Sequence, residues 1–553
     1  MFLTSNIKFN SNKRLVTNLS AFLFIFFIIS IQNSHGFQQP SEYSLNWGEL
    51  SIKIKTLNPY ESSTIEEKNI LNLIFGEPLY KSDPITNAIT RGIVESGVQS
   101  SETWLYNIRS DIRFQDGTPL TSEDVKFSIE TFNRFIENSG RFFNNEIAKI
   151  DSISILNRQW FQVYVSREVG DHELMLKDLP ILSRDYYQGG DFQSTLNNIS
   201  NKPPMGYGPY QVSSFIPESG ITLIRNEYYY LGRPEFSTVN IVFYEEQDRM
   251  TSDFITGDLH FIQVYDLRSR QEISRADTSL KILPVQLSEI PIYFINYNIT
   301  HPLLRSDRIR KSINQLYSKV NYTKSDIQGF HVRSIAAGPV PPRSVAFLQD
   351  LDKNNYDPNR ARSYFRRQGW NDRNGDGILE KNNVNFSLEL ILSDNDAYLE
   401  ELVRNIQRDL GEIGIEVTPV LITPEELRNR IRRNDFVLAL DKSIYYPHDL
   451  VRTFHNFFDI SGNTINRNRL GQNNTDALQN LGRAGQFLLQ DDAAEIFQRL
   501  QYLHSESATS EYLTYQHHIY YAINSKIISE FAPYNILVSP GLWKPVRDND
   551  NQQ

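Results

Sequence analysis

The strongest constraint on the fold is a regular alternation of strand and helix patterns between Phe386 and Leu440. Apolar residues alternate through 386–392, recur at helical spacing through 399–413, and alternate again through 415–422. A second helix pattern follows, and a continuous apolar run at 436–440 is typical of a strand buried on both faces. Strands that alternate with helices through short links predict a mixed or parallel sheet covered by helices, which is an α/β fold.

A turn followed by a helix start lies within residues 113–132. Asp116-Gly117 is a turn pair, because glycine adopts positive φ without a steric penalty. Thr121 is a candidate N-cap residue, and Asp124 three positions later completes a capping box. The pattern predicts a helix that begins just after Thr121.

Other patterns predict the order of further elements. We expect a strand over 50–57, where apolar and polar residues alternate, and a helix over 65–75. A helical spacing of apolar residues covers 309–320, and a strand alternation covers 512–524 near the end of the chain.

Composition excludes several classes of protein. At 553 residues the chain is long enough for two or three lobes, and its net charge of -10 disfavours nucleic acid as a partner. The absence of cysteine excludes disulfides, thiolate metal sites and cysteine nucleophiles. The sequence contains no Gly-x-Ser-x-Gly, P-loop or His-Glu-x-x-His motif, so we expect neither an enzyme nor a cofactor.

The N-terminus has the pattern of a secretory signal. Lys8, Lys13 and Arg14 form a basic start, and residues 19–31 form an apolar run that is short for a membrane span. Small residues near Gly36 suit cleavage before Phe37. We therefore expect a signal peptide at 1–36 and a periplasmic mature protein that is not a lipoprotein; the alternative is an uncleaved membrane anchor.

Several motifs occur in the order found in one family. Residues 113–132 contain Phe-x-Asp-Gly-Thr-Pro-Leu-Thr-x-Glu-Asp-Val-x-Phe-Ser, Gly206 begins Gly-Tyr-Gly-Pro-Tyr, and Tyr356 begins Tyr-Asp-Pro-Asn-Arg-Ala. With these motifs the chain, from about residue 50 to 540, resembles the family 5 extracytoplasmic solute-binding proteins, the oligopeptide- and dipeptide-binding components of ABC transporters.

The resemblance implies a two-lobed periplasmic-binding-protein fold of type II, with mixed sheets flanked by helices, an extra subdomain and a ligand cleft between the lobes. The implied divisions are lobe 1 at 37–290 with an accessory subdomain at about 66–200, lobe 2 at 291–510, return strands and hinge at 511–545, and a polar tail at 546–553.

The resemblance also implies function and partners. We expect a monomer that captures a peptide or peptide-like solute by hinged closure and delivers it to an ABC permease driven by separate ATPase subunits. The alternatives are a binding protein for a metal chelate, a sugar or a modified peptide, a ligand sensor for a membrane receptor and, more remotely, a secreted hydrolase that uses an Asp/Glu pair.

The residues after Leu440 bear most directly on ligand choice. Peptide-binding relatives carry Trp-x-x-Asp-Tyr here, and that aspartate pairs with the α-ammonium of the peptide. In this chain a tyrosine occupies the aspartate position, and Lys or Ser occupies the tryptophan position. The candidate ligand-binding residues are Asp441, Lys442, Ser443, Tyr445 and Tyr446. Asp441 is a possible substitute carboxylate; the alternatives are an N-blocked or cyclic peptide, another solute, or side chains that only fill the cleft wall.

Two further groups of residues are candidates for binding. Glu61 and Ser62 occupy the place where family members pair with a peptide backbone as an added strand. Asp372, Asn374 and Asp376 have the spacing of half a calcium loop, but Asn383 stands where the bidentate glutamate is required. A plain acidic turn is the alternative to a weak calcium site.

Overall fold

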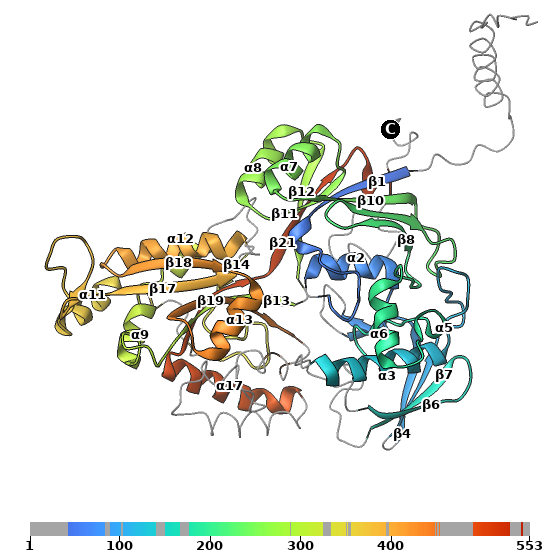
Figure 1. Cartoon of the computed structure of the whole chain (residues 1–553), viewed down its shortest axis with the longest axis horizontal. Helices are drawn as coiled ribbons and strands as arrows, with labels where there is room; N and C mark the ends of the chain where they lie inside the picture. The colour runs from blue at the N-terminus through green and yellow to red at the C-terminus, as the bar shows by residue number, and fades with distance from the viewer. Residues whose placement is uncertain are drawn as a thin grey trace, which may run out of the picture. The chain divides into compact units, whose positions relative to one another are not determined.

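The computed structural model describes residues 43–530 and 544–545, with gaps inside the first range. The gaps are residues 63, 83–88, 101–102, 140–149, 166–175, 288, 324–332, 350, 352–354, 394–396, 448–449, 451–452 and 454–489. Three sheets of four or more strands organise the described residues, and helices lie against them (Figure 1).

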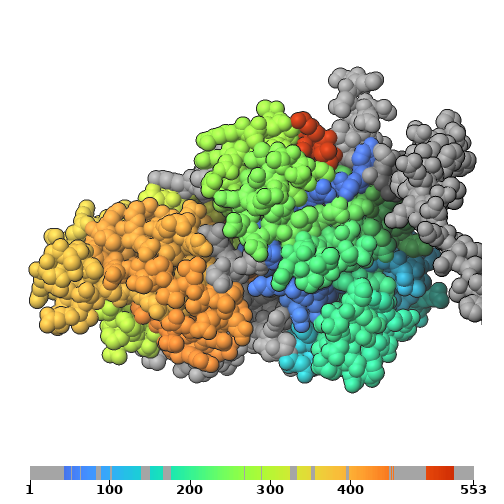
Figure 2. Space-filling model, turned by 45° about the horizontal axis from the view of Figure 1, so that its top comes forward, coloured from blue at the N-terminus to red at the C-terminus, as the bar shows by residue number. Residues whose placement is uncertain are grey.

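The largest sheet has seven strands and mixes parallel with antiparallel pairs. In spatial order the strands are β12 (Leu280–Gln286), β21 (His518–Asn524), β11 (Phe261–Val264), β1 (Tyr43–Leu50), β10 (Phe236–Tyr244), β9 (Gly220–Arg225) and β8 (Tyr210–Ile216). β1 and β11 run parallel, whereas β21 is antiparallel to both of its neighbours. Helices α7 (Gln247–Thr256) and α8 (Leu267–Ala276) pack on this sheet, and Figure 2 shows them in light green beside red residues near the C-terminal end.

Aromatic side chains fill the interior at the central strands of this sheet. The ring of Trp47 meets Phe261 edge-on with centroids 5.4 Å apart, and Phe261 stacks on Tyr521 at 5.0 Å. All three side chains are buried. They come from β1, β11 and β21, so one aromatic cluster joins three segments that are distant in sequence.

A four-stranded antiparallel sheet forms a second layer of structure. Its strands, in spatial order, are β4 (Val94–Ser100), β5 (Thr103–Ile108), β7 (Trp160–Val165) and β6 (Ile150–Ile155). The helices near it in sequence are α2 (Ile65–Phe75), α3 (Ser122–Ser139), α5 (Arg184–Tyr187) and α6 (Phe192–Asn201). Tyr106, Phe161 and Val125 are fully buried in a common core, so α3 packs its apolar face on the sheet.

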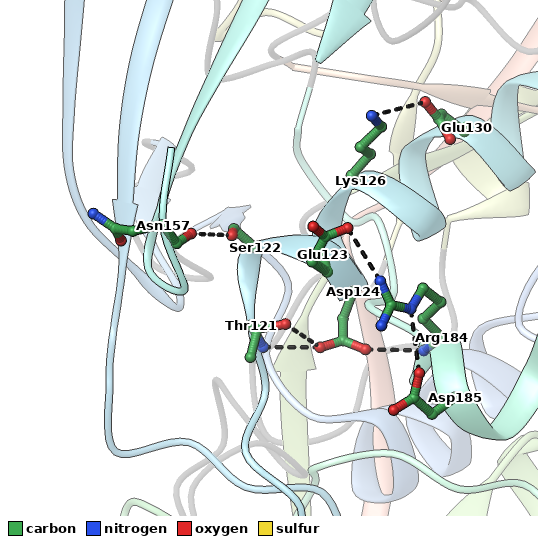
Figure 3. A network of polar contacts seen from close by, with 9 residues as sticks. All are labelled: Thr121, Ser122, Glu123, Asp124, Lys126, Glu130, Asn157, Arg184 and Asp185. Carbon is green, nitrogen blue, oxygen red and sulfur yellow. Dashed lines mark hydrogen bonds and ion pairs between the residues drawn. The ribbon is translucent and has the colours of Figure 1, made fainter. Parts of the chain in front are cut away.

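The start of α3 confirms the predicted helix and shows how it is anchored (Figure 3). Asp124 Oδ2 accepts hydrogen bonds from the backbone N–H and the hydroxyl of Thr121, at 2.9 and 2.8 Å. Asp124 Oδ1 accepts from the backbone N–H of Arg184 at 2.9 Å, and the Arg184 guanidinium pairs with Glu123. The carboxylate therefore closes the helix start and holds α5 against it.

The third sheet has six strands. In spatial order they are β14 (Arg333–Ile335), β20 (Ser510–Gln516), β13 (Ile290–Tyr297), β19 (Leu438–Tyr445), β17 (Ser387–Ser393) and β18 (Glu416–Ile422). The helices of this region are α9 (Asp307–Asn314), α10 (Lys319–Tyr322), α11 (Pro358–Arg367), α12 (Ala397–Gly411), α13 (Pro424–Arg433) and α17 (Gln490–Ser507).

The short elements elsewhere in the described residues are η1 (Ser51–Lys53), β2 (Tyr80–Ser82), β3 (Ile89–Arg91), β15 (Glu380–Lys381), β16 (Val384–Asn385), β22 (Ile528–Glu530) and β23 (Lys544–Pro545).

The parallel part of this sheet confirms the α/β prediction made from residues 386–440. β17 pairs in parallel with both β18 and β19. Leu390 of β17 packs in the core that contains α12, whereas the next residue, Ile391, packs in the core that contains Leu427 and Ile431 of α13. Successive side chains of a strand point to opposite faces, so α12 and α13 cover opposite faces of the sheet.

Two predicted elements differ in extent. The first strand is β1, Tyr43–Leu50, and the residues expected to form a strand at 50–57 begin instead with the turn η1, in which Ile54 N–H donates to Ser51 C=O. The helix expected over 309–320 is split into α9 and α10. In both places the apolar spacing continues past the point where the hydrogen-bonded element ends.

The C-terminal strand pattern at 512–524 belongs to two strands in two different sheets. β20 lies in the six-stranded sheet, and β21 lies in the seven-stranded sheet beside β11 (Figure 1). Only His517 separates them. The chain also passes between the same two sheets from β12 to β13, and Leu287 N–H in that passage donates to His517 C=O at 2.8 Å. The two passages therefore lie side by side.

Candidate functional site

The candidate residues after Leu440 form the second half of β19. The strand was expected to end at Leu440 but continues to Tyr445, because the whole of β13 pairs with it. Asp441 lies opposite Phe294 and Ser443 lies opposite Ile292. Alternation places Asp441, Ser443 and Tyr445 on one face of the sheet and Lys442 on the other, so the five candidates do not form a single surface.

Tyr445 is a core residue in this structure. Its side chain is 3 % exposed and packs with Leu450, Phe497 and Tyr515. Burial raises the pKa of its hydroxyl above the ordinary value. These contacts favour the alternative that the Tyr445 side chain only fills the cleft wall.

The neighbouring candidates are more accessible. Asp441 and Ser443 are partly buried, and Lys442 is exposed. Asp441 Oδ1 accepts from the backbone N–H of Lys442 at 2.8 Å. Tyr446 is partly buried, and its backbone N–H donates to Thr453 Oγ1 at 2.8 Å, so the end of the strand is tied to a buried side chain.

Glu61 and Ser62 lie in a tight turn that follows η1. Glu61 N–H donates to Asn58 C=O at 3.1 Å, and the Ser62 hydroxyl donates to Pro59 C=O at 3.3 Å. The Asn58 side chain holds the turn through Tyr60 N–H and the Ser200 hydroxyl. This turn follows a strand of the seven-stranded sheet, whereas Asp441–Tyr446 belong to the six-stranded sheet.

The calcium candidates lie in an exposed loop that uses its carboxylates internally. Asp372 accepts from the N–H groups of Gly375 and Gly377 at 2.7 and 3.0 Å, and Asp376 accepts from Ile378 N–H at 2.8 Å. Within the described part of the chain, no group of three or more His, Asp or Glu side chains is placed to hold a metal ion. The calcium site stays a prediction.

Sequence patterns missed a buried polar cluster at the carboxyl ends of the parallel strands β1 and β11. The Tyr265 hydroxyl lies 2.5 Å from Glu49 Oε1 and 3.1 Å from Glu66 Oε1, and Gln263 Nε2 donates to the same Glu66 oxygen at 3.1 Å. Both carboxyl groups are almost completely buried. The members of this cluster are far apart in the sequence. The one local sign of the cluster is that Glu49 lies on the same strand face as buried Trp47.

The two carboxyl groups of this cluster repel each other when ionised. Burial, and then the charge of Glu66, raise the pKa of Glu49 to about 8, although the hydrogen bonds from Tyr265 and from Leu50 N–H lower it. Glu49 Oε2 is buried and has no hydrogen-bond partner among the described residues. Glu49 therefore holds a proton near neutral pH.

Known proteins resemble this chain in sequence. The family model for bacterial extracellular solute-binding proteins, family 5, middle part, matches residues 89–464. The chain is 24% identical over 348 residues to the oligopeptide-binding protein AppA of Bacillus subtilis, a match that covers 57% of each chain. It is 23% identical over 428 residues to the nickel-binding periplasmic protein of Escherichia coli, covering 74% of this chain and 76% of that one.

Solved structures share the fold at low sequence identity. AppA in complex with a nonapeptide has a TM-score of 0.72 at 19% identity, covering 91% of this chain and 99% of AppA. NikA from Brucella suis in complex with Fe(III)-EDTA has a TM-score of 0.75 at 15% identity, covering 91% and 100%.

The fold is the two-lobed α/β architecture of periplasmic binding proteins. The chain belongs to family 5 of the bacterial extracellular solute-binding proteins. Members of this family are binding proteins that act outside the cytoplasm. In the described residues, every helix is too short or too polar to cross a membrane.

Proposed function

We propose that the protein is the solute-binding component of an ABC importer. It captures a peptide or peptide-like solute by closing two lobes around it, and it presents the closed form to a membrane permease. Energy comes from separate ATPase subunits, and the protein works as a periplasmic monomer after removal of residues 1–36.

The observation that carries this proposal is the pair of adjacent passages between the two large sheets. β12 leads to β13 and β20 leads to β21, and the passages are joined by the hydrogen bond from Leu287 N–H to His517 C=O. Short extended links of this kind let packed lobes rotate while each core stays intact. The predicted lobe boundaries near residues 290 and 510 support these two links as the proposed hinge.

Candidate contacts come from both sides of this hinge. Glu61 and Ser62 follow a strand of the first lobe, and Asp441, Ser443 and Tyr446 lie on or just after β19 of the second. A solute that touches both groups binds more tightly to the closed form, and this difference in affinity drives closure.

Other classes of solute and two other roles are alternatives to peptide import. A metal chelate is supported by the similarity to the nickel-binding periplasmic protein, and a sugar or a modified peptide would suit a site that lacks the aspartate for a peptide α-ammonium. A receptor-coupled sensor would use the same closure, whereas a hydrolase would need turnover that depends on one carboxylate.

A thermal-shift screen of the full secreted chain tests the proposal. Casein hydrolysate, nickel–histidine and a sugar panel are added to protein that has been unfolded and refolded to remove bound solute. We expect one fraction to raise Tm by several degrees, because a solute that binds only the folded state stabilises it by mass action. A constant Tm with all three fractions would contradict the proposal.

A further inference from the structure

Two buried side-chain oxygens on adjacent strands have no hydrogen-bond partner among the described residues. These atoms are Glu49 Oε2 and Gln263 Oε1, and the two residues are 0 % and 3 % exposed. Burying an acceptor without a partner is costly, because the atom loses its hydrogen bonds with water and gains none in return. Two such atoms in one cluster therefore point to a bound group.

The strand register places these two side chains next to each other. β1 and β11 are parallel neighbours that pair Trp47 with Phe261. Two residues further along both strands, the same register sets Glu49 beside Gln263, and adjacent strands are about 4.8 Å apart. Residues two apart in a strand share a face, so both side chains lie on the face where the rings of Trp47 and Phe261 meet.

Hydrogen bonds connect the same two side chains through Tyr265 and Glu66. The Tyr265 hydroxyl is within hydrogen-bond distance of Glu49 Oε1 and of Glu66 Oε1, and Gln263 Nε2 donates to that Glu66 oxygen. This bond fixes the orientation of the Gln263 amide, because a reversed amide would turn its oxygen toward the Glu66 carboxylate. Gln263 Oε1 is therefore the end of the amide that is left for another partner.

Acceptors outnumber donors in this cluster. The Tyr265 hydroxyl has one hydrogen for two carboxylate oxygens, and the backbone N–H of Leu50 donates to Glu49 Oε1, at 3.0 Å, rather than to Oε2. Within the described part of the chain, no donor reaches Glu49 Oε2. A cation suits such a place, because carboxylate and amide oxygens are the ligands that hard cations prefer.

The charges around Glu49 favour a cation with a single positive charge. Burial, and then the charge of Glu66, raise the pKa of Glu49, whereas the Lys53 charge lowers it. The Lys53 ammonium lies 5.5 Å from the ring centroid of Tyr265. Two ionised carboxyl groups and one ammonium leave one negative charge, and a buried charge needs a partner. A proton on Glu49 meets the same need, so a cation and a proton compete for one place.

Glu77 shows how the same chain buries a carboxylate for structural purposes. One of its oxygens pairs with the Lys81 ammonium, and the other accepts from the Tyr230 hydroxyl at 3.0 Å. Glu77 is 6 % exposed, and yet both of its oxygens have partners from the protein. Burial of a carboxylate alone therefore does not account for the state of Glu49, and Glu77 provides a matched control.

We propose that Glu49 and Gln263 bind a monovalent alkali cation at the carboxyl ends of β1 and β11. Glu49 Oε2 and Gln263 Oε1 are the protein oxygens that hold it, and Glu66 orients the amide and adds its negative charge. None of these residues is a candidate solute contact, so the site goes beyond the proposed import function. Because its members come from β1, β11 and α2, a bound cation stabilises the packing of α2 on the sheet.

Thermal unfolding of the full secreted chain in different salts tests the site. At pH 9, sodium chloride or potassium chloride replaces choline chloride at constant total concentration; the competing proton is then largely absent, because the pKa of Glu49 is about 8. We expect one alkali cation to raise Tm by about 2 °C along a saturating curve. The more effective cation identifies the size that the site accepts. Equal Tm values in choline, sodium and potassium would overturn the site, and so would a response to calcium chloride alone.

Two variants test the assigned ligands. Glu49→Gln removes the charge and Gln263→Met removes the amide oxygen, each with little change in volume. We expect both to abolish the rise in Tm with the alkali cation. Glu77→Gln should lower Tm by the same amount in every salt and keep the rise. If Glu49→Gln and Gln263→Met both keep the rise, the assignment is wrong.

Sodium NMR relaxation provides a readout that does not depend on stability. An ion held by the protein relaxes faster than a free ion, so wild type should broaden the sodium signal more than Glu49→Gln does, and excess of a competing alkali cation should reverse the broadening. Equal broadening by wild type and Glu49→Gln would contradict a cation at Glu49. The solute screen is unaffected by either result, so failure of this site leaves the proposed function standing.

Discussion

At the scale of single residues, Glu49 shows how burial changes an ionisable group. Its pKa is raised from 4.5 to about 8 by burial and by Glu66, with Tyr265 and Lys53 opposing that shift. A group whose folded pKa lies above its unfolded pKa stabilises the fold below the unfolded value, and this contribution is lost as pH rises through the folded value.

The first prediction follows from the raised pKa of Glu49. The free energy of unfolding of the wild type should fall between pH 5 and pH 8.5 by an amount on the order of a few kcal/mol, since one pKa unit is worth about 1.4 kcal/mol. Glu49→Gln, which mimics the protonated form, should flatten this slope. Urea denaturation across the pH range measures both, and an unchanged slope in the variant would show that Glu49 is ionised in the folded protein.

Tyr445 and Tyr446 provide a matched pair for the second prediction. Tyr445 is 3 % exposed in a core that contains Phe497 and Tyr515, whereas Tyr446 is only partly buried. Tyr445→Asp should lower the free energy of unfolding by about 3 kcal/mol or more, because it buries a carboxylate without a cationic partner. Tyr446→Asp should cost less than about 1 kcal/mol. Denaturation of both variants at pH 7 measures the difference, and equal losses would contradict the core assignment of Tyr445.

At the scale of elements, the Gly206–Tyr210 segment fits against the end of α2. A Cβ built on Gly206 would lie 2.3 Å from Ile74 O and 2.4 Å from Phe75 Cα, both of which are backbone atoms. Gln115 also bridges these elements, since its amide donates to Ile74 C=O at 2.8 Å and accepts from Gly206 N–H at 3.0 Å. The family motif at this place is thus a packing requirement.

The third prediction concerns this contact. Gly206→Ala should lower the free energy of unfolding by about 2 kcal/mol or more, because the clash is with backbone that cannot rotate away. Gly190→Ala should be close to neutral, since a Cβ there meets nothing within 4 Å. Thermal unfolding of the two variants gives the comparison, and equal Tm values would show that α2 shifts without penalty.

The elements also show what could be predicted from the sequence. The α/β stretch from Phe386 to Leu440 and the helix after Thr121 were predictable because periodicity, caps and turn residues agree there. The end of β19 was not, because Asp441–Tyr445 are polar or mixed and are held in the strand by pairing with β13. Local patterns carry no information about such a partner.

The candidate site was less predictable than the fold for the same reason. Glu49 and Tyr265 are 216 residues apart in sequence, and Glu66 joins them from helix α2. Their chemistry depends on which strands and helices are neighbours. The predicted contacts Glu61, Ser62 and Asp441–Tyr446 rest on position within the family, and they stay predictions.

At the scale of the whole molecule, the central claim is that two lobes close around a solute. In this proposal the two adjacent sheet-to-sheet passages are the hinge, and candidate contacts on both sides of it let a solute stabilise the closed form. In the proposed function, differential affinity for the closed form would convert binding into a signal for the permease.

Small-angle X-ray scattering measures whether the lobes close when a solute binds. The full secreted chain, freed of bound solute, is measured with and without the fraction that raises Tm in the screen, and with casein hydrolysate and nickel–histidine in any case. We expect a smaller radius of gyration with solute, in parallel with the rise in Tm, because closure brings the lobes together. A radius of gyration that stays the same while a solute binds at saturating concentration would contradict closure as the mechanism.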